Sequence, residues 1–216
     1  VGGSSALGVQ APLQIKRDVD VYFAGLDGSF GVPAGLSLIA LSERANLKTF
    51  SGSAAGLMLN FSRQKQLADR VPLFASRLYP QLHAVEKQLD RIFLEGLENR
   101  ETRLKRIAEN VRAWFETKGF TTLAESDCAS VGSTVVKRKP IFTARSLVDY
   151  CAAYGVYLGM CPDELAEDYF VVAHQGDCDE EDCKVLFSVL EKFIAEYDTD
   201  LRVKPNALRD FFKRGG

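Results

Sequence analysis

Residue types that perform acid–base or nucleophilic chemistry are sparse in this 216-residue sequence, which contains two histidines and five cysteines. His83 falls in a helical pattern directly after Leu82, so we expect it to be a packed or surface residue. His174 follows the apolar run Tyr169–Ala173 and precedes Gln-Gly-Asp, a position from which it can face a cleft. No serine, cysteine or carboxylate motif accompanies it, so the sequence does not indicate general acid–base catalysis at His174.

The cysteines are irregularly spaced and form neither a CxxC pair nor a cluster with histidine. This pattern predicts reduced intracellular thiols that pack as small hydrophobic residues, with a disulfide or metal role as the alternative. The five are Cys128, Cys151, Cys161, Cys178 and Cys183.

The acidic run DCDEEDC, Asp177–Cys183, looks like a metal site at first sight. Carboxylates at consecutive positions do not converge on one ion, and the spacing of an EF-hand is absent. Acidic residues before an apolar helical pattern instead cap free N–H groups and oppose the helix dipole, so we predict helix capping and no metal site.

Two glycine-rich segments raise the question of phosphate or ligand binding. Gly25–Gly35 holds four glycines and one proline between two apolar runs, and we interpret it as a sharp turn, with a loop that wraps a ligand as the alternative. Ser51–Gly56 lacks the Lys-Ser/Thr ending of a P-loop, so we expect a flexible connector.

Short apolar runs and helical periodicity alternate along the chain. We expect strands over 19–24, 36–41, 133–137 and 169–173, and a short one within 155–159. Helices are expected over 80–118, with a break at Gly96, and over 143–154 and 180–195. Charges between Glu86 and Lys118 are mixed, eight basic against seven acidic, which is typical of a solvated helix face.

Composition places the chain among folded globular proteins. The formal charge is −2, with 46 % hydrophobic and 26 % charged residues, which excludes a disordered chain and argues against a nucleic-acid binder. No apolar run approaches the length of a membrane span. The chain opens on Val1 without the features of a signal peptide, so we expect a processed chain or a piece of a longer protein.

Three stretches, in order, resemble the C-terminal half to three-fifths of a class V aminotransferase, a fold-type I enzyme dependent on pyridoxal phosphate. Residues 18–45, DVDVYFAGLDGSFGVPAGLSLIALSERA, are similar to the family segment that carries the Schiff-base lysine. Residues 81–116 are similar to the long interdomain helix, and residues 169–194 to the last strand, its His-x-Gly-Asp turn and the following helix.

The same resemblance marks several departures from the family. Gly28 stands where the family has the lysine that forms the internal aldimine, and Asp27 where a glutamine is usual. Gly2 falls where an aspartate pairs with the pyridinium nitrogen, and Val171 where an arginine binds the substrate carboxylate. Ser76 begins a segment that only partly fits the Thr-Pro pairs that the family places near the phosphate.

The resemblance implies an α/β fold, the C-terminal part of a fold-type I pyridoxal-phosphate transferase. Residues 1–80 would be a remnant of the large cofactor-binding domain, 81–118 the long interdomain helical segment, 119–197 the small α+β domain and 198–216 a basic tail. The family's N-terminal portion, which holds a Gly-rich phosphate loop, is missing from this sequence.

These departures predict an inactive aminotransferase-like protein with no catalytic residue and no cofactor, acting as a structural or regulatory subunit in a homo- or hetero-oligomer inside the cell. One alternative is an active pyridoxal-phosphate aminotransferase of the serine– or alanine–glyoxylate type, or a subunit that completes a partner's site. Another is a small-molecule sensor that uses a vestigial cleft near Gly28 and His174.

Overall fold

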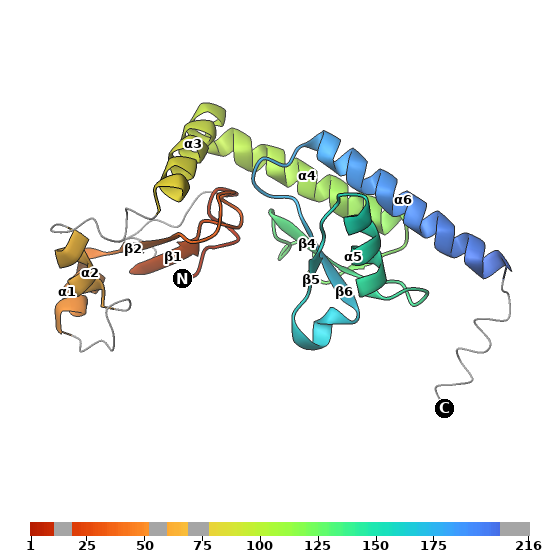
Figure 1. Ribbon diagram of the computed structural model, residues 1–216, viewed down its shortest axis with the longest axis horizontal. Helices are drawn as coiled ribbons and strands as arrows, with labels where there is room; N and C mark the ends of the chain where they lie inside the picture. The colour runs from red at the N-terminus through yellow and green to blue at the C-terminus, as the bar shows by residue number, and fades with distance from the viewer. Residues whose placement is uncertain (11–18, 52–59, 69–77, 204–216) are drawn as a thin grey trace. The chain divides into compact units, whose positions relative to one another are not determined.

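The structure, a computed structural model, describes residues 1–10, 19–51, 60–68 and 78–203 (Figure 1). The chain divides into two compact units. The first comprises Val1–Leu104 together with Gln175–Asp177, and the second comprises Lys105–His174 together with Cys178–Gly216. The division between Leu104 and Lys105 falls inside a long helix. The four domain ranges given above remain predictions.

In the first unit, strands β1 (Val21–Gly25) and β2 (Ser37–Leu41) form an antiparallel hairpin in which Val21 pairs with Leu41. The connection between them is a turn, held by a hydrogen bond from the N–H of Leu26 to the carbonyl of Leu36 (3.1 Å). Both strands lie within a residue or two of the ranges predicted from their apolar runs.

Four helical segments complete the described part of the first unit: α1 (Glu43–Ser51), α2 (Phe61–Ala68), α3 (Tyr79–Glu95) and the beginning of α4 (Leu97–Thr117). The predicted break at Gly96 is confirmed, because Gly96 has a φ of 84°, which a residue with a side chain rarely adopts. The core of this unit gathers around Leu26, Phe30, Val32 and Ile92.

The second unit is built on an antiparallel four-stranded sheet in the order β3-β4-β6-β5. Its strands are β3 (Thr121–Thr122), β4 (Ser133–Lys137), β5 (Gly159–Met160) and β6 (Tyr169–Ala173), joined in part by α5 (Ala144–Ala153) and a short 3₁₀ turn, η2 (Asp163–Ala166). The predicted strands 133–137 and 169–173 match β4 and β6 residue for residue.

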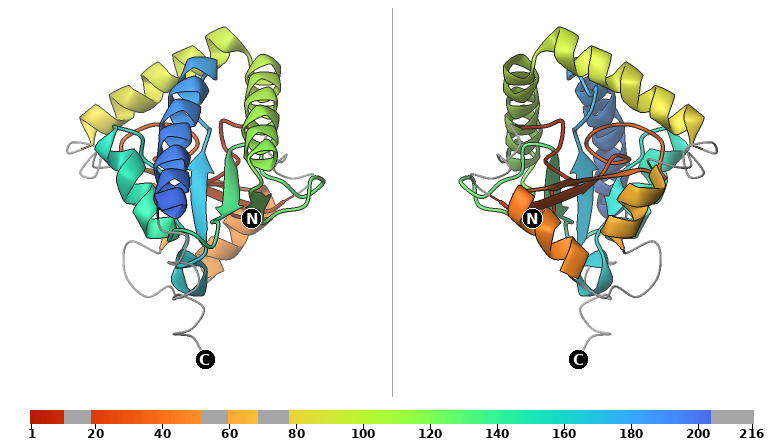
Figure 2. Two further views of the ribbon diagram at one scale, coloured as in Figure 1. Left: turned by 90° about the vertical axis from the view of Figure 1, so that its right-hand side faces the viewer. Right: turned by 90° about the vertical axis from the view of Figure 1, so that its left-hand side faces the viewer.

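Helix α6 (Glu180–Val203) closes the second unit. Figure 2 shows the strands of this unit among α4, α5 and α6. Trp114 of α4 stacks on Phe187 of α6 with ring centroids 4.7 Å apart, so these helices lie side by side. Fully buried Phe115, Phe170 and Phe193 fill the space between helices and sheet. The helix was predicted to end at residue 195 but continues further, since no glycine or proline interrupts it before Pro205.

Three predictions fall wholly or mainly outside the described residues. They concern the connector at 51–56, the segment that begins at Ser76 and the basic tail beyond residue 203. The described helices include none that is both long enough and apolar enough to cross a membrane.

Candidate functional site

Gly28 lies in the exposed turn after β1. A Cβ atom at this position would meet the carbonyl oxygen of Ser4 at 3.5 Å and the side-chain amide nitrogen of Gln175 at 4.0 Å. Both distances are ordinary van der Waals contacts, and the backbone of Gly28 is not in the left-handed region. The turn therefore has room for a side chain, and glycine is not required by its geometry.

Gly2 and Asp27 are the other described positions that the resemblance connects with the cofactor. Gly2 forms an isolated parallel bridge with Phe23, and a Cβ at Gly2 would touch the Phe23 ring at 3.2 Å. Asp27 is exposed, and its carboxylate points back toward Gly25, where an added Cβ would lie 2.7 Å from it. Gly2 has no carboxylate, the carboxylate of Asp27 does not replace it, and Gly28 has no amine.

Val171 lies in the middle of β6, paired with Val135 of β4 on one side and Gly159 of β5 on the other. It is partly buried, and the ideal Cβ position of Gly159 lies 3.2 Å from the Val171 Cβ. The side chain has no charge and no hydrogen-bond donor, so it cannot bind a carboxylate. The residues at three positions, Gly2, Gly28 and Val171, therefore do not fit the coenzyme chemistry that the resemblance implies.

His174 follows β6 and is almost completely buried, with 1 % of its surface exposed. Its Nε2 lies 2.9 Å from the Thr134 hydroxyl, whereas its Nδ1 is buried without a hydrogen-bond partner. Burial lowers the pKa of His174 to about 4, with a further lowering by the positive charge of Arg112, so the ring is neutral near pH 7.

A cavity of about 240 Å³ lies in the second unit, and His174 is part of its wall. Residues 155–158, which follow α5, and apolar residues from α4, β6 and α6 make most of the lining, and Cys178, Asp182 and Cys183 add polar groups at the start of α6. Gly28 is not among the lining residues. Gly28 belongs to the first unit and His174 to the second, so the vestigial cleft near both residues stays a prediction.

The acidic run before α6 caps the helix as predicted. Asp179 Oδ1 accepts hydrogen bonds from the N–H groups of Glu181 and Asp182, and Asp182 in turn accepts one from the N–H of Asp179 (3.0 Å). These reciprocal bonds are a capping box. No cluster of three or more metal-ligating side chains is found in the part of the chain that the structure describes.

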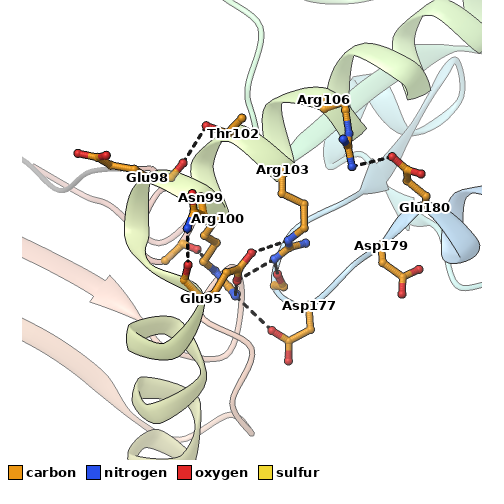
Figure 3. Close-up of polar contacts among 12 residues, drawn as sticks. Glu95, Glu98, Asn99, Arg100, Thr102, Arg103, Arg106, Asp177, Asp179 and Glu180 are labelled. Atoms are coloured by element: carbon orange, nitrogen blue, oxygen red, sulfur yellow. Dashed lines mark hydrogen bonds and ion pairs between the residues drawn. The ribbon is translucent and has the colours of Figure 1, made fainter.

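A cluster of charged residues that sequence reasoning missed joins α3, α4 and the segment after β6 (Figure 3). Arg100 is 1 % exposed and donates hydrogen bonds to the Gly8 carbonyl (2.7 Å), Glu95 (2.9 Å) and Asp177 (3.3 Å). Arg103 also binds Glu95, which lowers the pKa of that carboxyl. The expectation of a uniformly solvated charged face is therefore wrong at Arg100, which occupies the helical register of buried Leu104 and Ile107.

His83, the other histidine, lies on the exposed side of α3, where its Nδ1 is 3.2 Å from Glu86. This is one of the two placements expected for it.

Comparison with known proteins connects this architecture to aminotransferases. The chain is 24 % identical over 192 residues to an uncharacterised aminotransferase of Methanocaldococcus jannaschii, covering 87 % of this chain and 49 % of the relative. It is 25 % identical over 218 residues to a serine–glyoxylate aminotransferase of Methylorubrum extorquens, covering 96 % and 53 %. No protein-family profile matches. The chain thus spans about half the length of the curated relatives it matches.

Solved structures agree with this assignment of the fold. The ureidoglycine–glyoxylate aminotransferase of Bacillus subtilis superposes with a TM-score of 0.79 at 17 % identity, over 91 % of this chain and 52 % of that one. The pyridoxamine–pyruvate aminotransferase of Mesorhizobium loti gives a TM-score of 0.80 at 20 % identity, with the same coverage. The chain has a partial fold of the fold-type I pyridoxal-phosphate transferases, and both of these curated relatives are aminotransferases.

Proposed function

We propose that this chain is a non-catalytic aminotransferase-like protein that acts as a structural or regulatory subunit of a dimer or larger complex. The observation that carries the proposal is the residue at position 28, where the turn has space for a side chain but the chain supplies glycine. An enzyme that used this turn to anchor pyridoxal phosphate would need an amine there.

Two further positions support the loss of catalysis. Gly2 brings no carboxylate and Val171 no guanidinium to the positions where the resemblance expects them. Each missing contact removes an electrostatic interaction that usually contributes several kcal/mol to binding or catalysis. Functional side chains are missing at three positions while the hairpin, the helix pair and the sheet are retained. This combination favours a role of the fold in assembly.

The assembly role is supported by exposed apolar side chains on the first unit. Phe93 and Leu94 near the end of α3 are 72 % and 90 % exposed, and Phe23 and Ile39 on the hairpin are 53 % and 44 % exposed. Phe23 and Ile39 are paired across the hairpin, and adjoining exposed apolar side chains of this kind are found at protein–protein contact surfaces. In this proposal, another polypeptide covers these side chains and the complex lies inside the cell, which the irregular thiol pattern supports.

A second candidate function is an active aminotransferase, or a subunit that completes a partner's pyridoxal-phosphate site. It is favoured by the similarity to the serine–glyoxylate aminotransferase of Methylorubrum extorquens. In that case the chain would use an amine other than one at position 28, or would rely on the partner's amine.

The experiment that separates these candidates is native mass spectrometry of the complex purified from its source, together with absorbance spectra recorded before and after an amino acid is added. We expect an oligomer that contains this chain, without an absorbance band that shifts with the amino acid. A lone monomer would contradict the subunit role. A shifting coenzyme band would contradict the loss of catalysis, and labelling each chain would then identify which one holds the coenzyme.

A further inference from the structure

One cysteine lies on each side of the capping box at the start of α6. Asp179 is the N-cap residue of α6. Cys178 directly precedes it, and Cys183 is the fourth residue of the helix, counted from Glu180. These two positions form the hydrophobic staple of a helix N-terminus, where side chains pack against each other. In this chain both staple positions are cysteines, and both side chains line the same cavity.

The two thiols are unequal. The neighbouring Cys178 thiol lowers the pKa of Cys183, against the opposing effects of burial and of the nearby Asp182, Asp179 and Glu180 carboxylates. The neighbouring Cys183 and burial raise the pKa of Cys178. Cys183 is therefore the better nucleophile of the pair, and Cys178 is placed to react with it second.

The other buried cysteines differ from this pair. Burial raises the pKa of Cys151 to about 11 and also raises that of Cys161, so both are held as unreactive thiols. Cys128 is exposed in the segment between β3 and β4, which makes it a natural reference for the reactivity of a single cysteine.

The cavity gives a small reagent access to the pair. Cys178 and Cys183 both line the 240 Å³ cavity, although Cys183 itself is only 7 % exposed. A molecule the size of hydrogen peroxide fits such a space. The pair thus combines neighbouring staple positions, thiols of unequal acidity and a route for a small oxidant.

We propose that Cys178 and Cys183 form a dithiol modification site that a peroxide oxidises to an intrachain disulfide and that thiols reduce again. This goes beyond the aminotransferase-like role and does not depend on it. The cavity and the staple geometry, both within the second unit, carry the proposal.

The chemistry balances with hydrogen peroxide as the oxidant. The Cys183 thiolate attacks one peroxide oxygen, the O–O bond breaks, and the leaving hydroxide takes up a proton to become water. The Cys178 sulfur then attacks the sulfur of the Cys183 sulfenic acid, its proton leaves with the hydroxyl group as a second water, and the S–S bond forms. Two thiols are oxidised and one peroxide is reduced to two waters.

Differential alkylation of the full chain after brief peroxide treatment tests this. Free thiols are blocked with one reagent, disulfides are then reduced with dithiothreitol, and the released thiols are labelled with a second. We expect Cys178 and Cys183 to acquire the second label together and at least about tenfold faster than Cys128. Equal rates, or labelling of one of the pair without the other, would overturn the proposal.

Single variants test the order of the two steps. In Cys178→Ser, we expect a sulfenic acid to accumulate at Cys183 and to be trapped by dimedone, whereas Cys161→Ser should leave disulfide formation unchanged. A Cys178→Ser chain in which Cys183 is as inert to peroxide as Cys161 would contradict the assignment of Cys183 as the attacking thiol. The wild-type alkylation result stands by itself if either variant fails to fold.

Discussion

Arg100 of α4 and Asp177 after β6 are separated by 77 residues in the sequence and joined by a 3.3 Å ion pair in the first unit. The short segment Gln175–Asp177 returns to this unit although the chain before and after it belongs to the second. Asp177 also accepts hydrogen bonds from Gln88 (3.2 Å) and Arg91 (2.9 Å) of α3, so several contacts attach this segment to the first unit.

We predict that Arg100→Met lowers the free energy of unfolding by about 3 kcal/mol, because it removes a buried cation that is paired with Glu95 and Asp177. The matched control is Arg91→Met, which removes an exposed partner of the same Asp177 and should cost less than about 1 kcal/mol. Urea unfolding followed by circular dichroism measures both. Equal losses from the two variants would mean that burial of Arg100 does not matter.

The neutral, buried ring of His174 predicts a stability that depends on pH. Its pKa of about 4 in the folded chain lies below the value of about 6.5 expected when unfolded, so the unfolded state binds the extra proton between these limits. Stability therefore rises with pH across this window, and acidification from pH 7 to pH 5 should cost about 2 kcal/mol.

The control for this prediction is His174→Gln, which keeps a hydrogen-bonding group near Thr134 but does not titrate. Unfolding measured at several pH values should show a flatter profile for the variant between pH 7 and pH 5. The same slope in both proteins would assign the pH dependence to other groups.

The turn at Gly28 should accept a large side chain. We predict that Gly28→Lys changes the free energy of unfolding by less than about 1 kcal/mol, because the added Cβ meets atoms at 3.5 and 4.0 Å. Gly3→Ala is the contrasting variant, since its Cβ would overlap the buried Tyr22 hydroxyl, and it should cost about 1–3 kcal/mol. Thermal unfolding compares the two, and a larger loss at Gly28 would show that glycine is required there.

Loss of the cap at Asp179 should affect both α6 and the thiol pair. Asp179→Ala removes the acceptor of two backbone hydrogen bonds and should destabilise the chain by about 1 kcal/mol. It should also slow formation of the disulfide between Cys178 and Cys183, as measured by alkylation. Glu191→Ala, further along the exposed face of α6, should leave the disulfide rate unchanged. Equal rates in all three chains would separate the thiol chemistry from the capping box.

Much of the fold follows from local patterns in the sequence. The strands at 133–137 and 169–173 are short runs rich in β-branched and apolar residues, and Gly96 ends a clear helical period, so each was predictable without tertiary information. The departures at Gly28, Gly2 and Val171 came only from the family resemblance, because a glycine or valine has no chemistry of its own to notice.

Two features of the site could not be predicted, for physical reasons. Arg100 is buried because Gly8, Glu95 and Asp177 converge on it, and only the folded chain brings those acceptors together. Cys178 and Cys183 are five residues apart, which is not a recognised redox spacing. A capping box lies between them and both line one cavity, so the pairing can be proposed only once the start of α6 is located.

We propose above all that this fold has lost the amine that anchors the coenzyme. The most direct test is borohydride reduction of the purified complex in the presence of pyridoxal phosphate, followed by peptide mapping of this chain. We expect no lysine of the chain to carry a stoichiometric phosphopyridoxyl group, and only low, scattered labelling of surface lysines. A single lysine labelled to one equivalent per chain, and protected when an amino-acid substrate is added first, would contradict the account.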